Sequence, residues 1–429
     1  MANDKQNTSP NVPNKREQSG IYSGYAERGE LRPQGNVPNL RFPEFGGEWE
    51  KAYLNNITKI SKGAGISKEQ LSDTGIPCIL YGELYTKYKS EVITDVYSKT
   101  NIDNTNLITS RANDVIIPCS GETAIEIATA RCVLASDILL GGDLNVIRLN
   151  GHDGRFFAYQ LNGKRKIDIA KVAQGVSVVH LYGEHLKKIK VAYPSIEEQT
   201  KIAELLSLID RRISTQNKII EDLKKLKVAI CNKLIDNLVN HEPLIRFTEV
   251  YSKAGEGGTP ETSKSEYYEN GNIPFIKIDD LSNKYIISNK DFITDLGLQK
   301  SSAWIIPTHS LIYSNGATIG AISINTYEVC TKQGILGIVP QTSISVEYLY
   351  CLMSSNYFSK QVHRIITHGT MATAYLKDIN KIKVPIPCMQ KQLEIANTIS
   401  SVTNKIGTEL NILSLLLKQK QYLLQQMFI

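Results

Sequence analysis

Residues 188–207 read KIKVAYPSIEEQTKIAELLS, and residues 381–400 read KIKVPIPCMQKQLEIANTIS. The two stretches lie 193 residues apart and share nine identities over the 22 positions from 186 to 207. Similarity at a fixed offset within one chain indicates a duplicated structural unit. In both copies a short strand-like segment ends near a proline and runs into a periodic apolar segment. The chain is therefore predicted to contain the same unit twice.

Each copy ends in a long amphipathic pattern. Apolar residues recur at steps of three and four, which is typical of a helix that packs lengthwise on another helix. The first such helix is expected from Ser195 to about Val239, which at 1.5 Å per residue is ~65 Å long. The predicted seam comprises Ile202, Leu206, Ile209, Ile213, Ile220 and Leu223 in the first copy, and Ile395, Ile399, Val402, Ile406, Leu413 and Leu416 in the second.

Polar residues interrupt both seams in the same phase. Gln216 corresponds to Glu409, and Lys227 corresponds to Lys420. Polar groups on an apolar seam lower stability but help to fix register and orientation. We expect the two helices to form an antiparallel coiled coil with each other, because a matching partner in the same chain is present at high effective concentration. A parallel pair, or separate packing of each helix on its own domain, is the alternative.

The remainder of the chain predicts an α+β protein. Two mixed α/β domains are separated by the two long helices, with an internal pseudo-two-fold repeat. Short β-branched segments predict strands at 115–118, 144–149, 310–314 and 334–339, and residues 348–358 predict a helix. The expected organisation is a flexible amino-terminal extension at 1–38, domains at 39–194 and 241–388, a central helix at 195–240 and a carboxy-terminal helix at 389–429.

Composition favours a globular chain outside the membrane and the secretory pathway. Hydrophobic residues make up 41% and charged residues 21% of the sequence. No apolar run approaches the ~20 residues of a membrane span. The first 18 residues lack the apolar core of a secretory signal, so a cytoplasmic location is expected. The seven cysteines show no metal-ligand spacing, which favours reduced thiols.

Charge and motifs favour binding over catalysis. The net charge of +6 is spread along the chain, whereas a protein that holds DNA through phosphates alone needs a concentrated excess of Lys and Arg. DNA affinity would therefore depend on local patches or on a partner chain. Phosphate-binding loops, dinucleotide motifs, zinc-protease motifs and serine-hydrolase motifs are all missing from the sequence. We predict no catalytic residue and no metal site.

Several stretches carry a family resemblance. Residues 38–49 read PNLRFPEFGGEW, residues 75–88 read GIPCILYGELYTKY, and residues 257–260 read GGTP. Together with the two KIKV stretches that precede the long helices, their order resembles the specificity subunits of type I restriction-modification systems. The likeness extends over about 390 of the 429 residues. The first domain lacks Gly-Thr-Pro at its start, which suggests that it prefers a different DNA sequence from the second.

The resemblance implies a non-catalytic subunit that binds double-stranded DNA. Each recognition domain would read one half of a bipartite target, and the coiled coil would set the gap. Two methyltransferase subunits, which make N6-methyladenine, and restriction or translocase subunits would be the partners. S-adenosylmethionine, ATP and magnesium would belong to those partners, with no cofactor in this chain. The rival hypotheses are an enzyme with unrecognised motifs and an orphan DNA-binding regulator or structural coiled-coil protein without methyltransferase partners.

Candidate DNA contacts combine Lys and Tyr with polar turn residues. Lys contacts phosphate, Tyr stacks on bases or meets their edges, and Gln333 could read adenine. The alternatives are Tyr side chains packed on strands, solvated Lys and ordinary turn chemistry. The candidates are Lys62, Lys68, Tyr81, Tyr85, Lys87, Tyr88, Lys89, Ser120 and Thr123 in the first domain, and Thr259, Lys264, Lys277, Ser314, Asn315, Thr318, Lys332 and Gln333 in the second.

Overall fold

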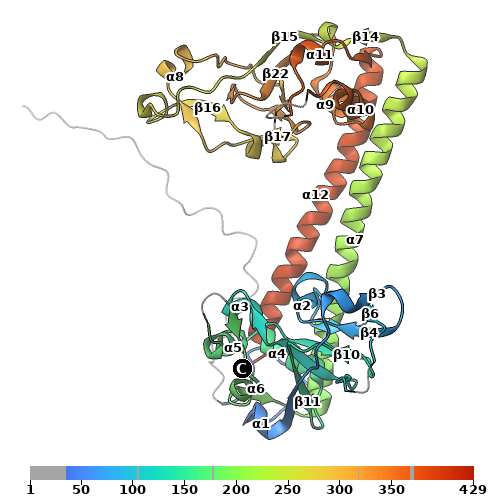
Figure 1. Cartoon of the computed structure of the whole chain (residues 1–429), viewed down its shortest axis with the longest axis vertical. Coiled ribbons are helices and arrows are strands. Elements are labelled where there is room, and N and C mark those ends of the chain that lie inside the picture. Colours follow the sequence, from blue (N-terminus) through green and yellow to red (C-terminus); the bar gives the residue numbers. More distant parts are fainter. Residues whose placement is uncertain (1–34, 104–105, 176–177, 317, 368–371) are drawn as a thin grey trace, which may run out of the picture. The chain divides into compact units, whose positions relative to one another are not determined.

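The computed structural model describes residues 35–103, 106–175, 178–316, 318–367 and 372–429. Residues 1–34, which make up most of the expected extension, lie outside this range. The chain divides into two compact units, one of residues 1–213 and 416–429, the other of residues 214–415. Each unit therefore combines one globular domain with a part of each long helix (Figure 1).

The domain of the first unit is built on a five-stranded sheet. Its neighbours are antiparallel except for the parallel pair of β5 and β9. The central strands bury almost every side chain, as expected for β-branched segments covered on both faces. In order across the sheet, the strands are β2 (Thr58–Lys62), β11 (Leu144–Leu149), β7 (Asp114–Pro118), β9 (Arg131–Val133) and β5 (Val92–Ile93).

Smaller elements surround this sheet. A second sheet has the order β10 (Leu139–Leu140), β4 (Ile76–Ile79), β6 (Ser98–Thr100), β3 (Leu71–Ser72), and two-stranded pairs join β1 (Glu50–Tyr53) to β13 (Lys190–Tyr193) and β8 (Ser120–Gly121) to β12 (Val179–His180). The short helices are α1 (Leu54–Ile57), η1 (Lys68–Gln70), α2 (Glu83–Thr86), α3 (Ala124–Ile127), α4 (Gly154–Asn162), α5 (Lys166–Val172) and α6 (Gly183–Leu186).

The segment at 38–49 closes the core of the first unit. Trp49 is buried, and its ring lies 5.6 Å from that of Phe156 in α4 and 6.4 Å from that of Phe428 near the carboxy terminus. Arg41 forms an ion pair of 2.7 Å with the buried Glu198. Aromatic contacts and a buried ion pair thus bind this segment to the start of one long helix and the end of the other.

The domain of the second unit repeats the five-stranded main sheet of the first. Its main sheet has the order β15 (Tyr251–Glu256), β22 (Ile335–Pro340), β19 (Leu311–Ser314), β20 (Ile322–Asn325), β17 (Tyr285–Ile286). The smaller sheet has the order β18 (Phe292–Ile293), β16 (Ile273–Ile276), β21 (Cys330–Thr331), and β14 (Leu244–Arg246) pairs with β23 (Lys383–Pro385). The helices are η2 (Phe247–Glu249), η3 (Ser265–Tyr267), η4 (Ile278–Ser282), α8 (Asp295–Gln299), α9 (Val346–Met353), α10 (Asn356–Ile365) and α11 (Leu376–Ile379).

One predicted element is wrong. The single helix expected at 348–358 is two helices, because α9 ends at Met353 and α10 begins at Asn356. Ser355 is buried between them, and its hydroxyl accepts a hydrogen bond from the backbone N–H of Phe358 at 3.3 Å. A serine cap of this kind satisfies a free N–H group at the start of a new helix, so the apolar pattern continues across a break.

Two long helices, α7 (Ile196–His241) and α12 (Met389–Gln426), pair antiparallel. In the second unit Gln216 contacts Glu409, while Glu242, just beyond α7, pairs with Lys391 near the start of α12 at 2.8 Å. Higher residue numbers on α7 therefore contact lower residue numbers on α12, as in an antiparallel pair. In the first unit, α7 shares one apolar core with the end of α12. The antiparallel alternative is therefore the one observed, and the predicted mixed fold with a repeat is confirmed.

The predicted seam residues are all buried or half-buried, and several belong to the cores of the two domains. The buried ones are Ile202, Leu206, Ile209, Ile220, Ile395, Ile399 and Ile406, and the half-buried ones are Ile213, Leu223, Val402, Leu413 and Leu416. Burial of a Leu or Ile side chain stabilises a fold by ~1.5–3 kcal/mol, so these seams contribute strongly to each unit.

Three further properties concern the described residues alone. None of their helices is both long enough and apolar enough to cross a membrane. Six cysteine thiols are buried and Cys388 is exposed. Within the same part of the chain, no three His, Cys, Asp or Glu side chains gather in a way that would hold a metal ion.

Candidate functional site

Backbone hydrogen bonds align the two domains residue by residue. Gly63 donates to the carbonyl of Leu144, and Gly257 donates to the carbonyl of Ile335, both at 2.9 Å. Gly141 donates to the carbonyl of Ile79 at 2.9 Å, and its counterpart Lys332 donates to that of Ile276 at 3.0 Å. Three segments therefore meet at the same place in each domain: the loop after β2 or β15, the loop after β4 or β16, and the loop between β10 and β11 or between β21 and β22.

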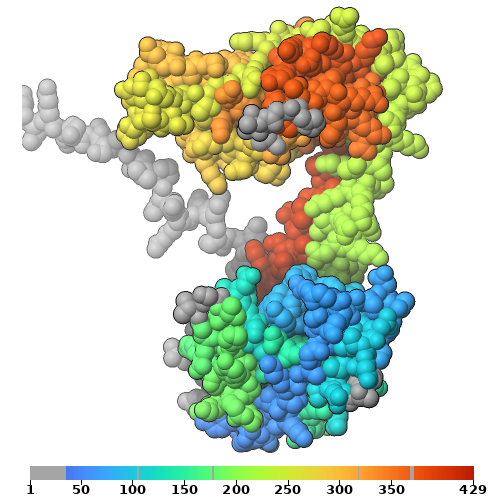
Figure 2. All heavy atoms as spheres, in the orientation of Figure 1, coloured from blue at the N-terminus to red at the C-terminus, as the bar shows by residue number. Residues whose placement is uncertain are grey.

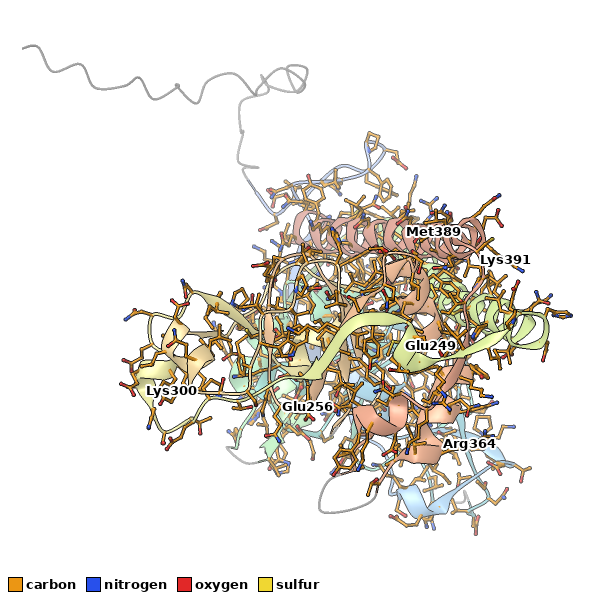
Figure 3. The ribbon with its side chains drawn as sticks, turned by 90° about the horizontal axis from the view of Figure 1, so that it is seen from above. Glu249, Glu256, Lys300, Arg364, Met389 and Lys391 are labelled. Carbon is orange, nitrogen blue, oxygen red and sulfur yellow. The ribbon has the colours of Figure 1, made fainter. Side chains whose placement is uncertain are left out.

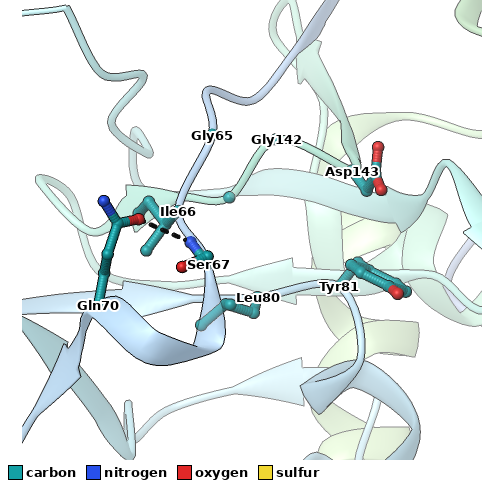
Figure 4. Close-up of a pocket in the computed structure, with 9 residues that line it drawn as sticks. Gly65, Ile66, Ser67, Gln70, Leu80, Tyr81, Gly142 and Asp143 are labelled. Carbon is teal, nitrogen blue, oxygen red and sulfur yellow. Dashed lines mark hydrogen bonds between the residues drawn. The ribbon is translucent and has the colours of Figure 1, made fainter.

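In the first domain these loops enclose a cavity of about 450 Å³. Figure 4 shows Tyr81 and Asp143 on one side of it and Ser67 and Gln70 on the other. The backbone N–H of Ser67 donates to Gln70 Oε1 at 2.9 Å, which holds the η1 turn. The lining is Gly65, Ile66, Ser67, Gln70, Leu80, Tyr81, Gly141, Gly142 and Asp143.

A second cavity of about 490 Å³ opens beside the first, and Asp143 lines both. Ser120 Oγ lies 3.3 Å from His180 Nδ1, and the His180 ring stacks on the exposed ring of Tyr182 with centroids 6.2 Å apart. Burial raises the pKa of the Cys119 thiol in this cavity to about 11, so it is protonated at neutral pH. The two cavities offer hydrogen-bonding and stacking groups rather than a nucleophile.

In the second domain the same three loops bring together four predicted residues. Gln333 donates its backbone N–H to Thr259 Oγ1 at 3.3 Å. Lys277 directly follows Ile276, whose carbonyl accepts a hydrogen bond from the backbone N–H of the exposed Lys332. The Lys277 ammonium pairs with Asp291 at 2.7 Å. These residues were chosen from separate stretches of sequence, and the fold places them at one site.

The loop that carries Gln333 is fixed by its own backbone. Gly334 has a φ of +86°, a conformation that only glycine adopts at little cost. Its N–H donates to Glu256 Oε1 at 2.8 Å, at the end of β15 (Figure 3). Gln333 is thus presented outward on a tight turn, with its side chain exposed.

The glycine motif after β15 has a steric cause that also applies to the first domain. A Cβ atom on Gly257 would lie 2.1 Å from the carbonyl oxygen of Thr331, and one on Gly63 would lie 2.1 Å from that of Gly141. Both domains therefore need glycine where the two loops cross. Thr259 of the second domain, however, corresponds to Gly65 of the first. The first domain therefore lacks the Gly-Thr-Pro side chains but keeps the backbone of this loop.

Comparison with known proteins places this architecture in a family. The family model described as the type I restriction modification DNA specificity domain matches residues 46–225 and 245–417. The chain belongs to this specificity family. Each match covers one copy of the repeat, so the chain contains two specificity domains.

Individual relatives agree with this assignment. The type I restriction enzyme MjaVIII specificity subunit of Methanocaldococcus jannaschii is 25% identical over 392 residues, which cover 86% of this chain and 88% of that one. The EcoR124I/EcoR124II specificity subunit of Escherichia coli is 29% identical over 173 residues, 39% of this chain and 43% of that one.

Two solved structures share the fold. The type I restriction-modification S subunit from M. genitalium has a TM-score of 0.55 and 20% identity, and the match covers 92% of this chain and 99% of that one. A chain from a study of complex assembly and conformational transition in a type I restriction-modification system has a TM-score of 0.59 and 16% identity, covering 89% and 97%.

The Lys and Tyr candidates in the first specificity domain have mixed positions. Tyr88 is only 5% exposed and stacks on Tyr97 with centroids 5.4 Å apart, so its predicted DNA contact is wrong and the packing alternative holds. Tyr85 is half-buried and donates to the carbonyl of Ser120 at 3.3 Å. Lys87 pairs with Glu83 at 2.7 Å. Tyr81, at 39% exposure, faces the first cavity.

Other candidates in this domain lie at the surface. Lys68 is exposed on η1, and the Lys89 ammonium donates to the carbonyl of Tyr85 at 2.9 Å. Lys62 is exposed and lines the second cavity. The hydroxyl of Thr123 caps α3 by accepting from the N–H of Glu126 at 3.2 Å, which is the ordinary turn chemistry weighed against a DNA contact.

In the second specificity domain two candidates are corrected. Ser314 and Asn315 are fully buried, so their side chains cannot meet DNA in this conformation. They close the end of β19, where the backbone of Asn315 bonds to Gly334 and Ala374. Thr318 is exposed, and Lys264 lies 3.3 Å from the hydroxyl of Tyr267.

Hydrogen bonds also align the two copies at this point. Cys119 donates its backbone N–H to the carbonyl of Asp143 at 2.7 Å, and Asn315 donates to that of Gly334 at 3.0 Å, which makes Cys119 the counterpart of Asn315. Both side chains are buried, so this position faces the core in both domains.

Sequence reasoning missed Asp143 and His180. Asp143 lies in the stretch Gly-Gly-Asp-Leu at 141–144, which by itself indicates no DNA contact. The position of Asp143 in the repeat could have indicated it, since residues 141–143 and 332–334 both follow a short strand and precede a buried one. His180 reaches Ser120 only through the pairing of β12 with β8, which no local pattern announces.

Proposed function

We propose that this chain is the DNA-sequence-specificity subunit of a type I restriction-modification complex, in which each domain reads one half of a bipartite target. The observation that carries the proposal is the repeated site: both domains bring the same three loops together on the same backbone, with different side chains at corresponding positions. One docking geometry with two sets of base-reading groups suits two different half-sites.

The long helices suit the role of a spacer. Each is one continuous helix, and polar contacts fix the register of the pair at Gln216 and Glu409. The separation of two reading modules sets the spacing of the half-sites that can be bound together, as in dimeric DNA-binding proteins. We infer that the coiled coil sets the gap in the target.

Exposed apolar residues on the helices favour protein partners. In the second unit, Ile219 and Leu226 lie seven residues apart on α7, and Ile412 and Leu415 lie three apart on α12, so each pair shares a side of its helix. Leu415 is 65% exposed. Figure 2 shows the middle of α7, in lime, uncovered by other segments in that view. Exposed apolar stripes of this kind mark protein contacts.

We infer that two methyltransferase subunits bind to these helices and that restriction or translocase subunits join them. The partners would supply S-adenosylmethionine, ATP and magnesium, methylate adenine at N6, and work with this chain in the cytoplasm. They would also contribute phosphate contacts, since the charge of this chain is spread out. The chain itself would bind and direct, without catalysis.

Genome-wide mapping of N6-methyladenine tests this proposal. Cells that contain the chain should carry a two-part methylated sequence with a fixed gap, deletion of its gene should abolish that methylation, and the restored gene should return it. A methylome unchanged by the deletion would contradict the proposal. The purified chain alone, given DNA, magnesium and S-adenosylmethionine, should neither cleave nor methylate, and activity there would favour the enzyme hypothesis.

A further inference from the structure

We propose that Asp143 reads a base in the half-site of the first domain, its carboxylate accepting a hydrogen bond from the N4 amino group of a cytosine. This inference rests on the proposed function and adds a residue and a chemistry to it. It starts from the position of Asp143, which lies on the loop between β10 and β11, one residue beyond the counterpart of Gln333.

The surroundings of Asp143 form a concave, polar surface. Asp143 lines both cavities of the first domain, with Tyr81 on the wall of one and Ser120 and His180 on the wall of the other. The Asp143 side chain therefore borders both cavities, beside aromatic and hydrogen-bonding groups. A base edge that enters either cavity would contact this side chain.

The backbone of the loop is held firmly. Asp143 accepts a hydrogen bond at its carbonyl from the N–H of Cys119 at 2.7 Å. Gly142 packs on the loop after β2, where a Cβ atom at Gly142 would lie 3.1 Å from the Cα of Gly65. A fixed backbone beneath an exposed side chain is the arrangement that a specific contact needs.

The carboxylate itself remains available. Its one described ionic contact is with the Lys62 ammonium at 3.5 Å, and the two side chains are 44% and 64% exposed. Ion pairs between exposed groups at such a distance contribute little and exchange readily. On DNA, Lys62 can turn to a backbone phosphate while Asp143 meets the base.

The chemistry of a carboxylate then selects the base. A carboxylate only accepts hydrogen bonds, so it needs an amino group in the major groove and is repelled by the carbonyl oxygens of guanine and thymine. Cytosine N4 is the better partner, because adenine presents the acceptor N7 beside its N6 amino group. In the second domain Gly334 stands at the position of Asp143, and Gln333 stands at that of Gly142. The two domains thus carry different side chains on a shared loop backbone.

Selection from a randomised duplex library, with the full chain in complex with its methyltransferase subunits, tests the role of Asp143. The wild type should select two half-sites, one of which has a G·C pair at a fixed position that Asp143 contacts. Asp143→Ala removes the acceptor and should reduce the preference for that G·C pair by roughly 5- to 150-fold, corresponding to the cost of one wrong base. The other half-site and the gap should stay unchanged.

Three further variants make the test specific. Asp143→Glu keeps the carboxylate acceptor and should retain a preference for the G·C pair. Asp73→Ala changes an exposed aspartate outside both cavities and should leave selection as in the wild type. Gln333→Ala should alter only the other half-site.

An Asp143→Ala complex that selects as the wild type does, or that changes both half-sites, would overturn the inference. So would an Asp143→Glu complex that prefers an A·T pair at the affected position, and this variant also decides the matter if Asp143→Ala fails to fold. A wild-type complex that selects no two-part sequence would instead refute the proposed function, so the two failures are distinguishable.

Discussion

Gln216 Nε2 donates a hydrogen bond to Glu409 Oε2 at 2.5 Å, and the two residues occupy the same position in the two copies of the repeat. In an antiparallel pair of equivalent helices, a residue that contacts its own counterpart marks the local two-fold of the pairing. The same amide also donates to the backbone carbonyl of Glu409 at 3.0 Å, and Lys405 pairs with the carboxylate at 2.5 Å. Any slip of one helix along the other would separate these groups.

Gln216→Leu should destabilise the helix pair. The substitution removes a donor from a buried carboxylate, whose pKa is held below its ordinary value by Lys405 and then by Gln216. We expect the melting temperature to fall by about 2–4 °C. The double variant Gln216→Leu/Glu409→Leu should recover most of this loss, because both partners then become apolar. A Gln216→Leu variant that melts at the wild-type temperature would show that this contact does not stabilise the helix pair.

Lys420→Met should destabilise the first unit severely. The Lys420 ammonium pairs with Glu91 at 2.5 Å and with Asp210 at 2.6 Å, and all three side chains are nearly buried. Removing the cation leaves two buried carboxylates unpaired, which costs ~3–5 kcal/mol. Urea denaturation of the full chain measures the loss. Lys418→Met, two positions away and exposed, is the matched control and should change stability little.

The same ion pairs predict a loss of stability at alkaline pH. Burial disfavours the charged form of Lys420, but Glu91 and Asp210 outweigh it and raise the pKa of Lys420 above its ordinary value. The stabilisation is therefore complete below the unfolded pKa of ~10.4 and is lost as the pH rises through the higher folded pKa. Denaturation midpoints between roughly pH 9 and 11 should fall more steeply for the wild type than for Lys420→Met. Parallel curves would contradict this.

Lengthening the helix pair in register should lengthen the gap in the target. A heptad inserted after Lys225 and another after Ser400 would preserve both seams and add ~10.5 Å to the pair. At 3.4 Å per base pair this predicts a gap longer by about three base pairs, with both half-sites retained. A heptad in only one helix should disrupt folding. An unchanged gap in an active complex with both insertions would refute the spacer role.

Leu415→Glu should weaken partner binding without unfolding the chain. Leu415 is the most exposed of the apolar residues on α12, so a charge there costs little in the isolated chain. Recovery of methyltransferase subunits with a tagged chain should fall at least several-fold, while the melting temperature stays within about 2 °C. Asn411→Glu, an exposed polar position on the same helix, should bind partners normally. Equal recovery with Leu415→Glu would exclude this surface.

Sequence reasoning reached the long helices because the repeat of 193 residues is best preserved where a seam imposes a strict period. It also selected Thr259, Lys277, Lys332 and Gln333, which the fold brings together. In the matching site of the first domain the sequence indicated Tyr81 but not Asp143, because these loops retain the backbone of the second domain and not its residues. Whether Tyr88 packs inside or faces outward depends on contacts with Tyr97, which no local pattern encodes.

The most direct test of two independent reading domains is an exchange of residues 241–388 for the second domain of another family member, followed by mapping of methylated adenines. One half-site should be replaced by that of the donor, while the other half-site and the gap remain. If both half-sites change, or if neither does, the account of one half-site per domain is contradicted.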